Sequence, residues 1–252
     1  TETTSDIGRM IPSEEFSVSV GRKGPEPAEL VGEDLWRGVL PDPQLLRLSP
    51  PDGIIRSQAS WRLLWKYWGG GVAAPAYDPA TQIALVATVP GRRTQGTPLI
   101  WPDGRVEFAV GGTTELCEGV GYQIALISSE GIRRINGKPY RSDLATEWIP
   151  GEIRIPSELA TFTKAKVTIS LYRTSGRRTD LPAERIAEVE LEDISHERWE
   201  GEKAYGFGVG GITSIRPGVV YYVEMKVESE EYRERQFRNV EEENVVVFTM
   251  GE

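Results

Sequence analysis

From about residue 80 onward, apolar and polar residues alternate with a period of two, the pattern of β-strands that bury one face. The segments are short, rich in Val, Ile, Tyr and Phe, and separated by turn sequences such as PGRR, PDGR and TSGRR. The segments with this pattern are 81–89, 105–110, 121–128, 151–156, 166–173, 185–192, 219–227 and 244–250. Many short strands between closely spaced turns predict a mainly β chain of sandwich or barrel type.

An internal similarity suggests that the β region is duplicated. LVATVPGRRT (85–94) resembles LYRTSGRRT (171–179) with one gap, and LCEGVGYQIAL (116–126) resembles IRPGVVYYVEM (215–225). The two pairs of segments occur in the same order along the chain. This order predicts two related antiparallel β-sandwich domains in tandem.

The segment IRPGVVYYVEMKV (215–227) resembles the tyrosine corner of fibronectin type III and other immunoglobulin-like sandwiches. The positions that carry the resemblance are Ile215, Pro217, Gly218, Tyr221 and Val223. It implies that Tyr221 packs at the edge of a sandwich while its hydroxyl fixes the connection into the next strand. The resemblance covers roughly residues 160–250.

A weaker version of this corner occurs in the first repeat, where Tyr122 takes the place of Tyr221 and Glu118 replaces the proline. No Trp lies in 166–173, where fibronectin domains usually carry one, so the subtype stays open. A jelly-roll layer gives a similar strand pattern and remains an alternative. An immunoglobulin-like fold supports many functions and implies none by itself.

The first 56 residues differ in character from the rest because seven prolines interrupt them. Only 30–40 could form a short helix there. The expected division is an extended arm over 1–56, a first β-domain over 57–156 and a second, immunoglobulin-like β-domain over 157–252. Within the arm, FSVSV alternates like a strand, and its Phe16 and Val18 are candidates for pairing with a neighbouring subunit. A flexible tail is the alternative.

Three of the seven tryptophans lie in the stretch SWRLLWKYWGGG (60–71). A helix would place Trp61, Leu64, Trp65 and Trp68 on one face. Its start would be capped by Ser57 or Ser60 and its end by Gly69.

A strand would instead group Trp61, Leu63, Trp65 and Tyr67. With either structure, we interpret the aromatic face as a wedge that locks the arm to a β-domain or to a neighbouring subunit. An exposed platform for sugar stacking is an alternative. Membrane insertion is disfavoured because the segment is short and the chain is acidic.

Residues suited to catalysis or to metal binding are scarce. His196 is the only histidine and stands in a charged stretch, where we expect a solvated loop. Cys117 is the only cysteine, which excludes an intrachain disulfide and a zinc–thiolate cluster, and we expect it to be a small buried residue. GFGVGG (206–211) leads into a strand rather than a helix, so we expect a glycine-rich strand or bulge and not a dinucleotide site.

Glutamates gather near the C-terminus, at Glu228, Glu230, Glu231 and 241–243. We expect a solvated face paired with nearby arginines, with a Ca²⁺ site as the alternative. No catalytic, cofactor-binding or metal-ligating residue is predicted, and we expect no cofactor.

A formal net charge of −9 argues against direct nucleic-acid binding, which needs a basic face. No apolar run approaches the ~20 residues that span a bilayer, and the N-terminus does not read as a signal peptide. The lack of disulfides favours synthesis in the cytosol. Scarce Asn, Met, His and Cys beside abundant Glu and Arg favour a heat-adapted host.

These features together lead us to expect a non-enzymatic structural subunit of a large assembly. We expect it to be a capsid, capsid-associated or tail protein of a virus or phage of a thermophile. Its location would be the virion, which is assembled in the host cytoplasm. Its partners would be copies of itself and other structural proteins. One alternative is a filament or adhesion subunit at the cell surface, and another is a carbohydrate-binding module with a surface glycan as ligand.

Overall fold

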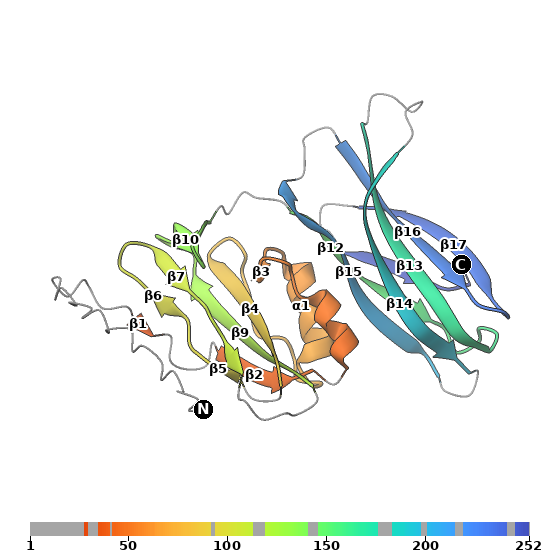
Figure 1. Ribbon diagram of the computed structural model, residues 1–252, viewed down its shortest axis with the longest axis horizontal. Helices are drawn as coiled ribbons and strands as arrows, with labels where there is room; N and C mark the ends of the chain where they lie inside the picture. The colour runs from red at the N-terminus through yellow and green to blue at the C-terminus, as the bar shows by residue number, and fades with distance from the viewer. Residues whose placement is uncertain are drawn as a thin grey trace, which may run out of the picture.

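The computed structural model describes residues 28–29, 35–40, 42–91, 94–112, 119–140, 146–175, 183–197, 201–214, 219–240 and 245–251. The predicted mainly β class is confirmed, with several antiparallel sheets (Figure 1). Phe16 and Val18, the strand candidates of the predicted arm, lie outside the described residues.

The N-terminal half is built around a sheet with the strand order β2–β9–β4–β3. These strands are β2 (Leu35–Val39), β9 (Val120–Ser128), β4 (Gln82–Pro90) and β3 (Ile54–Ile55). The helix α1 (Gln58–Trp68) covers one face, and a second sheet covers the other (Figure 1). The order in that second sheet is β1 (Ala28–Glu29), β6 (Leu99–Ile100), β7 (Arg105–Glu107), β10 (Arg134–Ile135) and β11 (Lys138–Pro139). A short pair, β5 (Thr94–Gln95) and β8 (Gly111–Gly112), lies against β9 and β4 of the central sheet.

The central sheet is buried on both faces. On strand β9, Ile124 and Leu126 pack in the cluster with α1, whereas Ala125 and Ile127 pack in the cluster with Val106 of β7. The sequence of β9 is almost continuously apolar, which is typical of strands covered on both sides. This layering differs from a simple sandwich, in which each sheet has one solvent-facing side.

Residues 35–56 contribute to this first core. A short helix was possible within 30–40, but residues 35–39 form strand β2 instead and pair with β9 from Leu35↔Ala125 to Val39↔Gly121. Leu40 and Ile55 are buried against α1. Pairing with a fully buried strand stabilises the extended conformation of a segment too short to form a stable helix.

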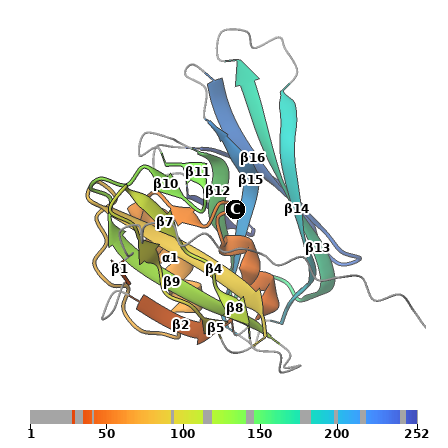
Figure 2. The same ribbon diagram turned by 60° about the vertical axis from the view of Figure 1, so that its left-hand side comes forward.

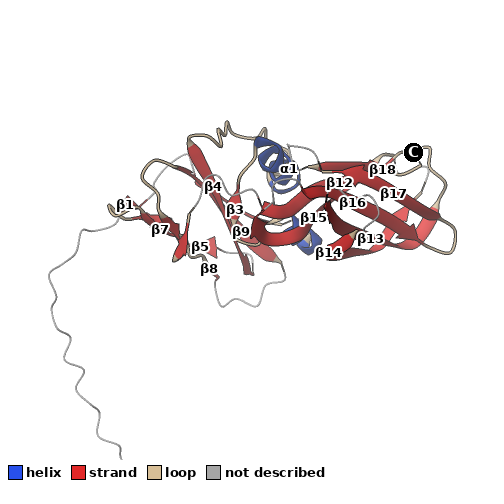
Figure 3. Cartoon of the chain, turned by 90° about the horizontal axis from the view of Figure 1, so that it is seen from above, coloured by secondary structure: helices blue, strands red, loops and turns tan. Residues whose placement is uncertain are grey.

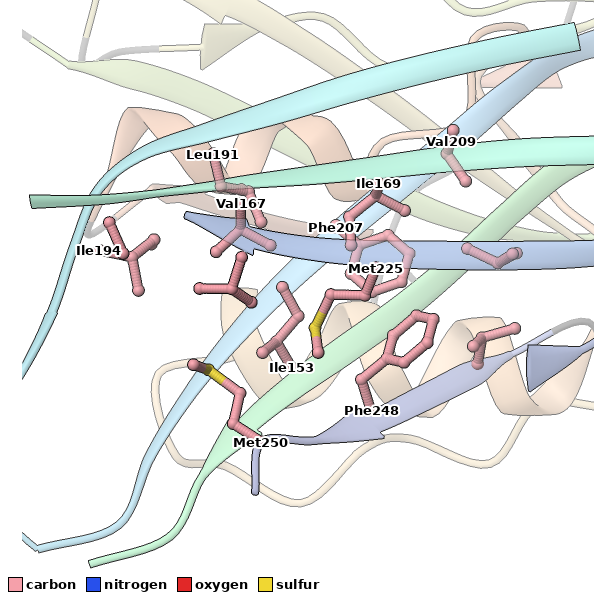
Figure 4. Packing of buried hydrophobic residues seen from close by; sticks show 14 of the residues in the cluster. Ile153, Val167, Ile169, Leu191, Ile194, Phe207, Val209, Met225, Phe248 and Met250 are labelled. Atoms are coloured by element: carbon pink, nitrogen blue, oxygen red, sulfur yellow. The ribbon is translucent and has the colours of Figure 1, made fainter. Parts of the chain in front are cut away.

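The C-terminal half packs two sheets against each other. One has the order β15 (Lys203–Ser214), β12 (Thr146–Ile155) and β18 (Val246–Thr249). The other has the order β14 (Glu184–His196), β13 (Phe162–Ser175), β16 (Val219–Glu228) and β17 (Arg233–Asn239). Side chains from both sheets interdigitate between them, including Ile153 and Phe207 from the first and Ile169 and Met225 from the second (Figure 4).

Strand β12 belongs to this second core, whereas the sequence division placed residues 146–155 with the preceding strands. It pairs antiparallel with β15 and parallel with β18. The pairing with β18, almost a hundred residues away, leaves no signal in the local sequence of β12. The GFGVGG segment lies within β15, as expected for a glycine-rich strand.

Candidate functional site

The aromatic stretch forms helix α1 as the helical spacing predicts. The Ser57 hydroxyl accepts a hydrogen bond from the Ser60 amide at 3.1 Å, and the Gly69 amide closes the last turn on the Trp65 carbonyl. A Cβ at position 69 would lie within 2.6 Å of the Trp65 ring, so a glycine is required there. The alternative strand grouping is therefore wrong.

All four predicted wedge residues are buried in one cluster: Trp61, Leu64, Trp65 and Trp68. Each indole N–H donates to a backbone carbonyl. Trp61 donates to Pro75 at 2.9 Å, Trp65 to Val72 at 2.9 Å and Trp68 to Leu45 at 3.1 Å. Because the rings are buried with their polar atoms satisfied, they fix two segments to the helix, the connection after it and residues 43–48, and leave no exposed face for sugar stacking.

Further aromatic side chains complete this cluster. The Trp36 ring lies 5.3 Å from the Trp65 ring in an edge-on arrangement, and the Tyr77 ring lies 5.5 Å from the Trp61 ring. Trp36 and Tyr77 were not predicted to join the cluster, because they lie 25 and 16 residues from Trp61 and only the tertiary structure brings the rings together. Trp36 comes from β2, so this strand, which lies within the predicted arm, packs against α1 in the first core.

The tyrosines of the two predicted corners lie in different cores. Tyr122 is buried and its hydroxyl donates to the Trp68 carbonyl at 2.6 Å, so it anchors the end of α1 rather than a connection between strands. Tyr221 is buried in the second core. Positions 215–218 of its motif lie outside the described residues.

The two halves meet where α1 and the short helix η1 (Pro43–Leu48) pack on the outer face of β12 and β15 (Figure 3). Two glycines of β15 permit the contact. A Cβ on Gly206 would lie 2.7 Å from the Leu48 side chain, and a Cβ on Gly208 would overlap the Arg47 carbonyl. The glycine-rich strand therefore serves close packing of backbone on backbone.

A buried carboxylate completes the junction. Glu152 of β12 is 1% exposed and accepts hydrogen bonds from Lys66 (2.5 Å) and Tyr67 (3.0 Å) of α1 and from Arg154 (2.6 Å) of its own strand. Burial opposes ionisation of Glu152, but these three donors outweigh it and lower its pKa. Burial and the Glu152 carboxylate together raise the pKa of Tyr67, so its phenol stays protonated and donates.

Replacing Glu152 by Gln is expected to lower the free energy of unfolding by about 1–3 kcal/mol at pH 7, since charge-assisted hydrogen bonds are lost. Because the pKa is depressed in the folded state, the contribution is present above the ordinary value of 4.5 and is lost as the pH falls through the lower folded value. Urea unfolding of both proteins at a series of pH values measures the difference, which should shrink below about pH 4.5. Glu107→Gln, at an exposed carboxylate of β7, is the control and should change little. A difference that grows in acid would contradict this interpretation.

The expectation of a solvated loop for His196 is wrong. His196 ends strand β14 with 0% exposure, pairs with Phe162 of β13 and packs on its ring at a centroid distance of 6.1 Å. Neither ring nitrogen has a hydrogen-bond partner in the described part of the chain. The charged residues beside His196 in the sequence suggested exposure. The β-bulges between β13 and β14 change which side chains face inward, so the sequence pattern did not predict that His196 is buried.

His196→Leu is expected to raise the free energy of unfolding by about 1–2 kcal/mol, because an unpaired buried polar ring is replaced by an apolar group of similar volume. Urea unfolding at pH 7 measures the change. His196→Asn keeps an unpaired polar group in the same place and should give no gain. Destabilisation by both variants would show that the imidazole makes a necessary polar contact.

The outer face of the four-stranded sheet carries a shallow groove of about 470 Å³ between rows of charged side chains. Two of its ion pairs, Lys166–Glu190 and Arg235–Glu224, join neighbouring strands. Two others, Arg185–Glu188 and Lys226–Glu228, each lie within one strand. An aromatic group lies at one end, where Tyr172 and Tyr222 stack at 5.0 Å and the half-exposed Phe237 meets Tyr222 at 6.0 Å.

Other predicted features are placed only in part. Cys117 and residues 241–243 lie outside the described residues. Within the described ranges, no three or more His, Cys, Asp or Glu side chains gather as a metal site would require. Among the helices that the structure describes, none has the length and apolar character to cross a membrane.

Comparison with known proteins identifies no family. No family model matches the chain, and no curated protein matches it. Among solved structures, the chain is similar to an alternative pilotin from the type II secretion system of Vibrio cholerae, with 17% sequence identity and a TM-score of 0.31. The match covers 42% of this chain and 95% of the pilotin chain.

Proposed function

We propose that this chain is a non-enzymatic structural subunit of a large protein assembly, and specifically a capsid, capsid-associated or tail protein of a virion from a thermophilic host. In this proposal the two cores act as tandem β-domains with an N-terminal arm. The observation that carries it is the junction between the cores. A subunit with contacts on both of its ends must hold those ends at a fixed angle for an assembly to close or repeat regularly.

The junction is suited to that requirement. It combines close backbone packing at Gly206 and Gly208 with a buried carboxylate, Glu152, held from both halves. Close-packed interiors have low compressibility, so a force on one half is transmitted to the other. A flexible linker between the two cores would not hold them at a fixed angle.

The ion pairs on the outer sheet support the thermophilic part of the proposal. Lys166–Glu190 and Lys226–Glu228 join exposed side chains, and Arg173–Glu184 joins a partly buried arginine to an exposed glutamate, with N–O distances of 2.5–2.9 Å. Single exposed pairs contribute little at 25 °C, but networks gain weight at high temperature because charged groups are then less favourably hydrated.

The test is particle mass by light scattering after size exclusion, followed by negative-stain imaging. Rings, lattices or filaments much heavier than the 28.0 kDa chain support the proposal, and their shape separates capsid, tail and surface filament. A clean monomer across a wide range of concentration and salt would overturn it.

Carbohydrate binding is the second candidate, and the aromatic end of the outer groove favours it. Phe237 is 49% exposed and Tyr222 lies beside it, next to polar groups that could bind sugar hydroxyls. Calorimetric titration with a panel of oligosaccharides tests this. Phe237→Ala should abolish binding, whereas Val247→Ala, at an exposed apolar position on β18 in the other sheet, should not. Absence of binding to the whole panel would reject it.

A further inference from the structure

Two strands, β14 and β17, form the edges of the four-stranded sheet in the C-terminal half. Each is paired on one side only within the described residues, to β13 and to β16 respectively. Figure 2 shows β13 and β14 on the side of the molecule away from the N-terminal half. Unpaired edges of this kind are templates for another strand unless the protein blocks them.

The strand directions allow the sheet to continue from one copy to the next. All neighbours in the order β14–β13–β16–β17 are antiparallel, so β14 runs opposite to β17. A second copy displaced sideways along the sheet, without being turned over, would therefore place its β14 antiparallel to β17 of the first. This is a head-to-tail contact, which repeats without closing unless the rotation between copies closes a ring.

The two edges carry opposite charge. Strand β14 holds five carboxylates and one arginine, and strand β17 holds three arginines and one carboxylate. The respective net charges of −4 and +2 follow directly from these counts. Like charges on two edges would repel each other and so prevent association between copies. The opposite charges of β14 and β17 instead favour contact between the β17 edge of one copy and the β14 edge of another.

The charges lie on the same face of the sheet. Leu191 of β14 is buried, so Glu190 and Glu192 beside it point outward. Gln236 of β17 is buried, so Arg235 and the half-exposed Phe237 point outward. A continued sheet would set the outward glutamates of one copy beside the outward arginines of the next, and would cover Phe237.

Both edges are regular over enough length to pair. Strand β17 pairs with β16 over seven consecutive residues, from Arg233 to Asn239, without a bulge. Strand β14 pairs regularly with β13 from Ala187 to Leu191, between two shifts of register. Five residues is an ordinary length for a strand pairing.

We propose that copies of this chain associate through β17 of one copy and β14 of the next, as one continuous antiparallel sheet. This inference rests on the proposed assembly function and identifies the contact that builds it. Each added strand is rotated relative to the last by the natural twist of a sheet, so the product is a twisted ribbon or a ring.

Arg233→Glu on β17 and Glu192→Arg on β14 test the proposal, since both side chains are exposed. Each variant alone is expected to weaken self-association by about fivefold or more at low ionic strength, measured by sedimentation velocity. An equimolar mixture of the two should regain most of the association, because the carboxylate introduced at position 233 of one variant then meets the guanidinium introduced at position 192 of the other. Lys138→Glu, on β11 in the N-terminal half, makes the same charge change as Arg233→Glu and should have no effect.

Hydrogen exchange of the unmodified protein gives an independent readout that does not depend on the variants folding. Amides of β14 and β17 should become more protected as protein concentration rises, while those of β11 should not change. Assembly that persists unchanged in both variants, with no added protection at the edges, would overturn this contact and leave the assembly function standing. A monomer under all conditions would overturn both.

Discussion

Trp61→Ala is expected to lower the free energy of unfolding by about 3–5 kcal/mol, the range for removing a large aromatic side chain from a packed core. The Trp61 side chain is 1% exposed and its ring contacts those of Trp36, Trp65 and Tyr77. The change also leaves the Pro75 carbonyl without its donor. Urea unfolding followed by far-UV circular dichroism measures the loss.

The matched control is Arg62→Ala, one residue along the same helix on its exposed side. Alanine favours helix at least as well as arginine, so this variant should stay within about 0.5 kcal/mol of the unmodified protein. A loss below about 1 kcal/mol for Trp61→Ala would mean that the aromatic cluster is not the centre of the first core.

Gly208→Ala is expected to cost about 2–3 kcal/mol and to loosen the junction between the two halves. The added methyl group would overlap the Arg47 carbonyl and lie 2.8 Å from the Trp148 ring, so η1 must move away from β15. Urea unfolding gives the free energy. Hydrogen exchange of residues 43–48 reports the loosening, and those amides should exchange faster in the variant.

Gly211→Ala on the same strand is the control, because a Cβ there has no heavy atom within 4 Å. It should leave both stability and exchange at residues 43–48 unchanged, or stabilise slightly through the unfolded chain. Equal effects of the two substitutions would show that strand propensity, rather than the contact with η1, explains the glycine at position 208.

Local patterns predicted what depends on neighbours in the sequence. The strand-like segments predicted from about residue 80 onward include the long strands β4, β9, β13 and β16, and the spacing of Trp61, Trp65 and Trp68 identified α1 with its Ser57 and Gly69 caps. These features follow from side-chain direction along a single element.

Strands whose pairing partners lie far away in the sequence were not predicted correctly. Strand β2 was not predicted, because its partner β9 lies about 85 residues away in the sequence. Strand β12 was grouped with the preceding strands, because its pairing with β15 and β18 is also long-range. The nearly unbroken apolar sequence of β9 did contain the information that both of its faces are covered.

The amino-acid sequence by itself determined the β class, the aromatic helix and the scarcity of groups suited to catalysis. Only the tertiary structure decided that His196 is buried and that Glu152 joins the two halves, because the environment of a polar side chain is set by elements remote in the chain. It also decided the opposite charges of the two sheet edges. The sequence gives the charge of each strand. The strand order, which long-range pairing sets, makes β14 and β17 the edges of the sheet.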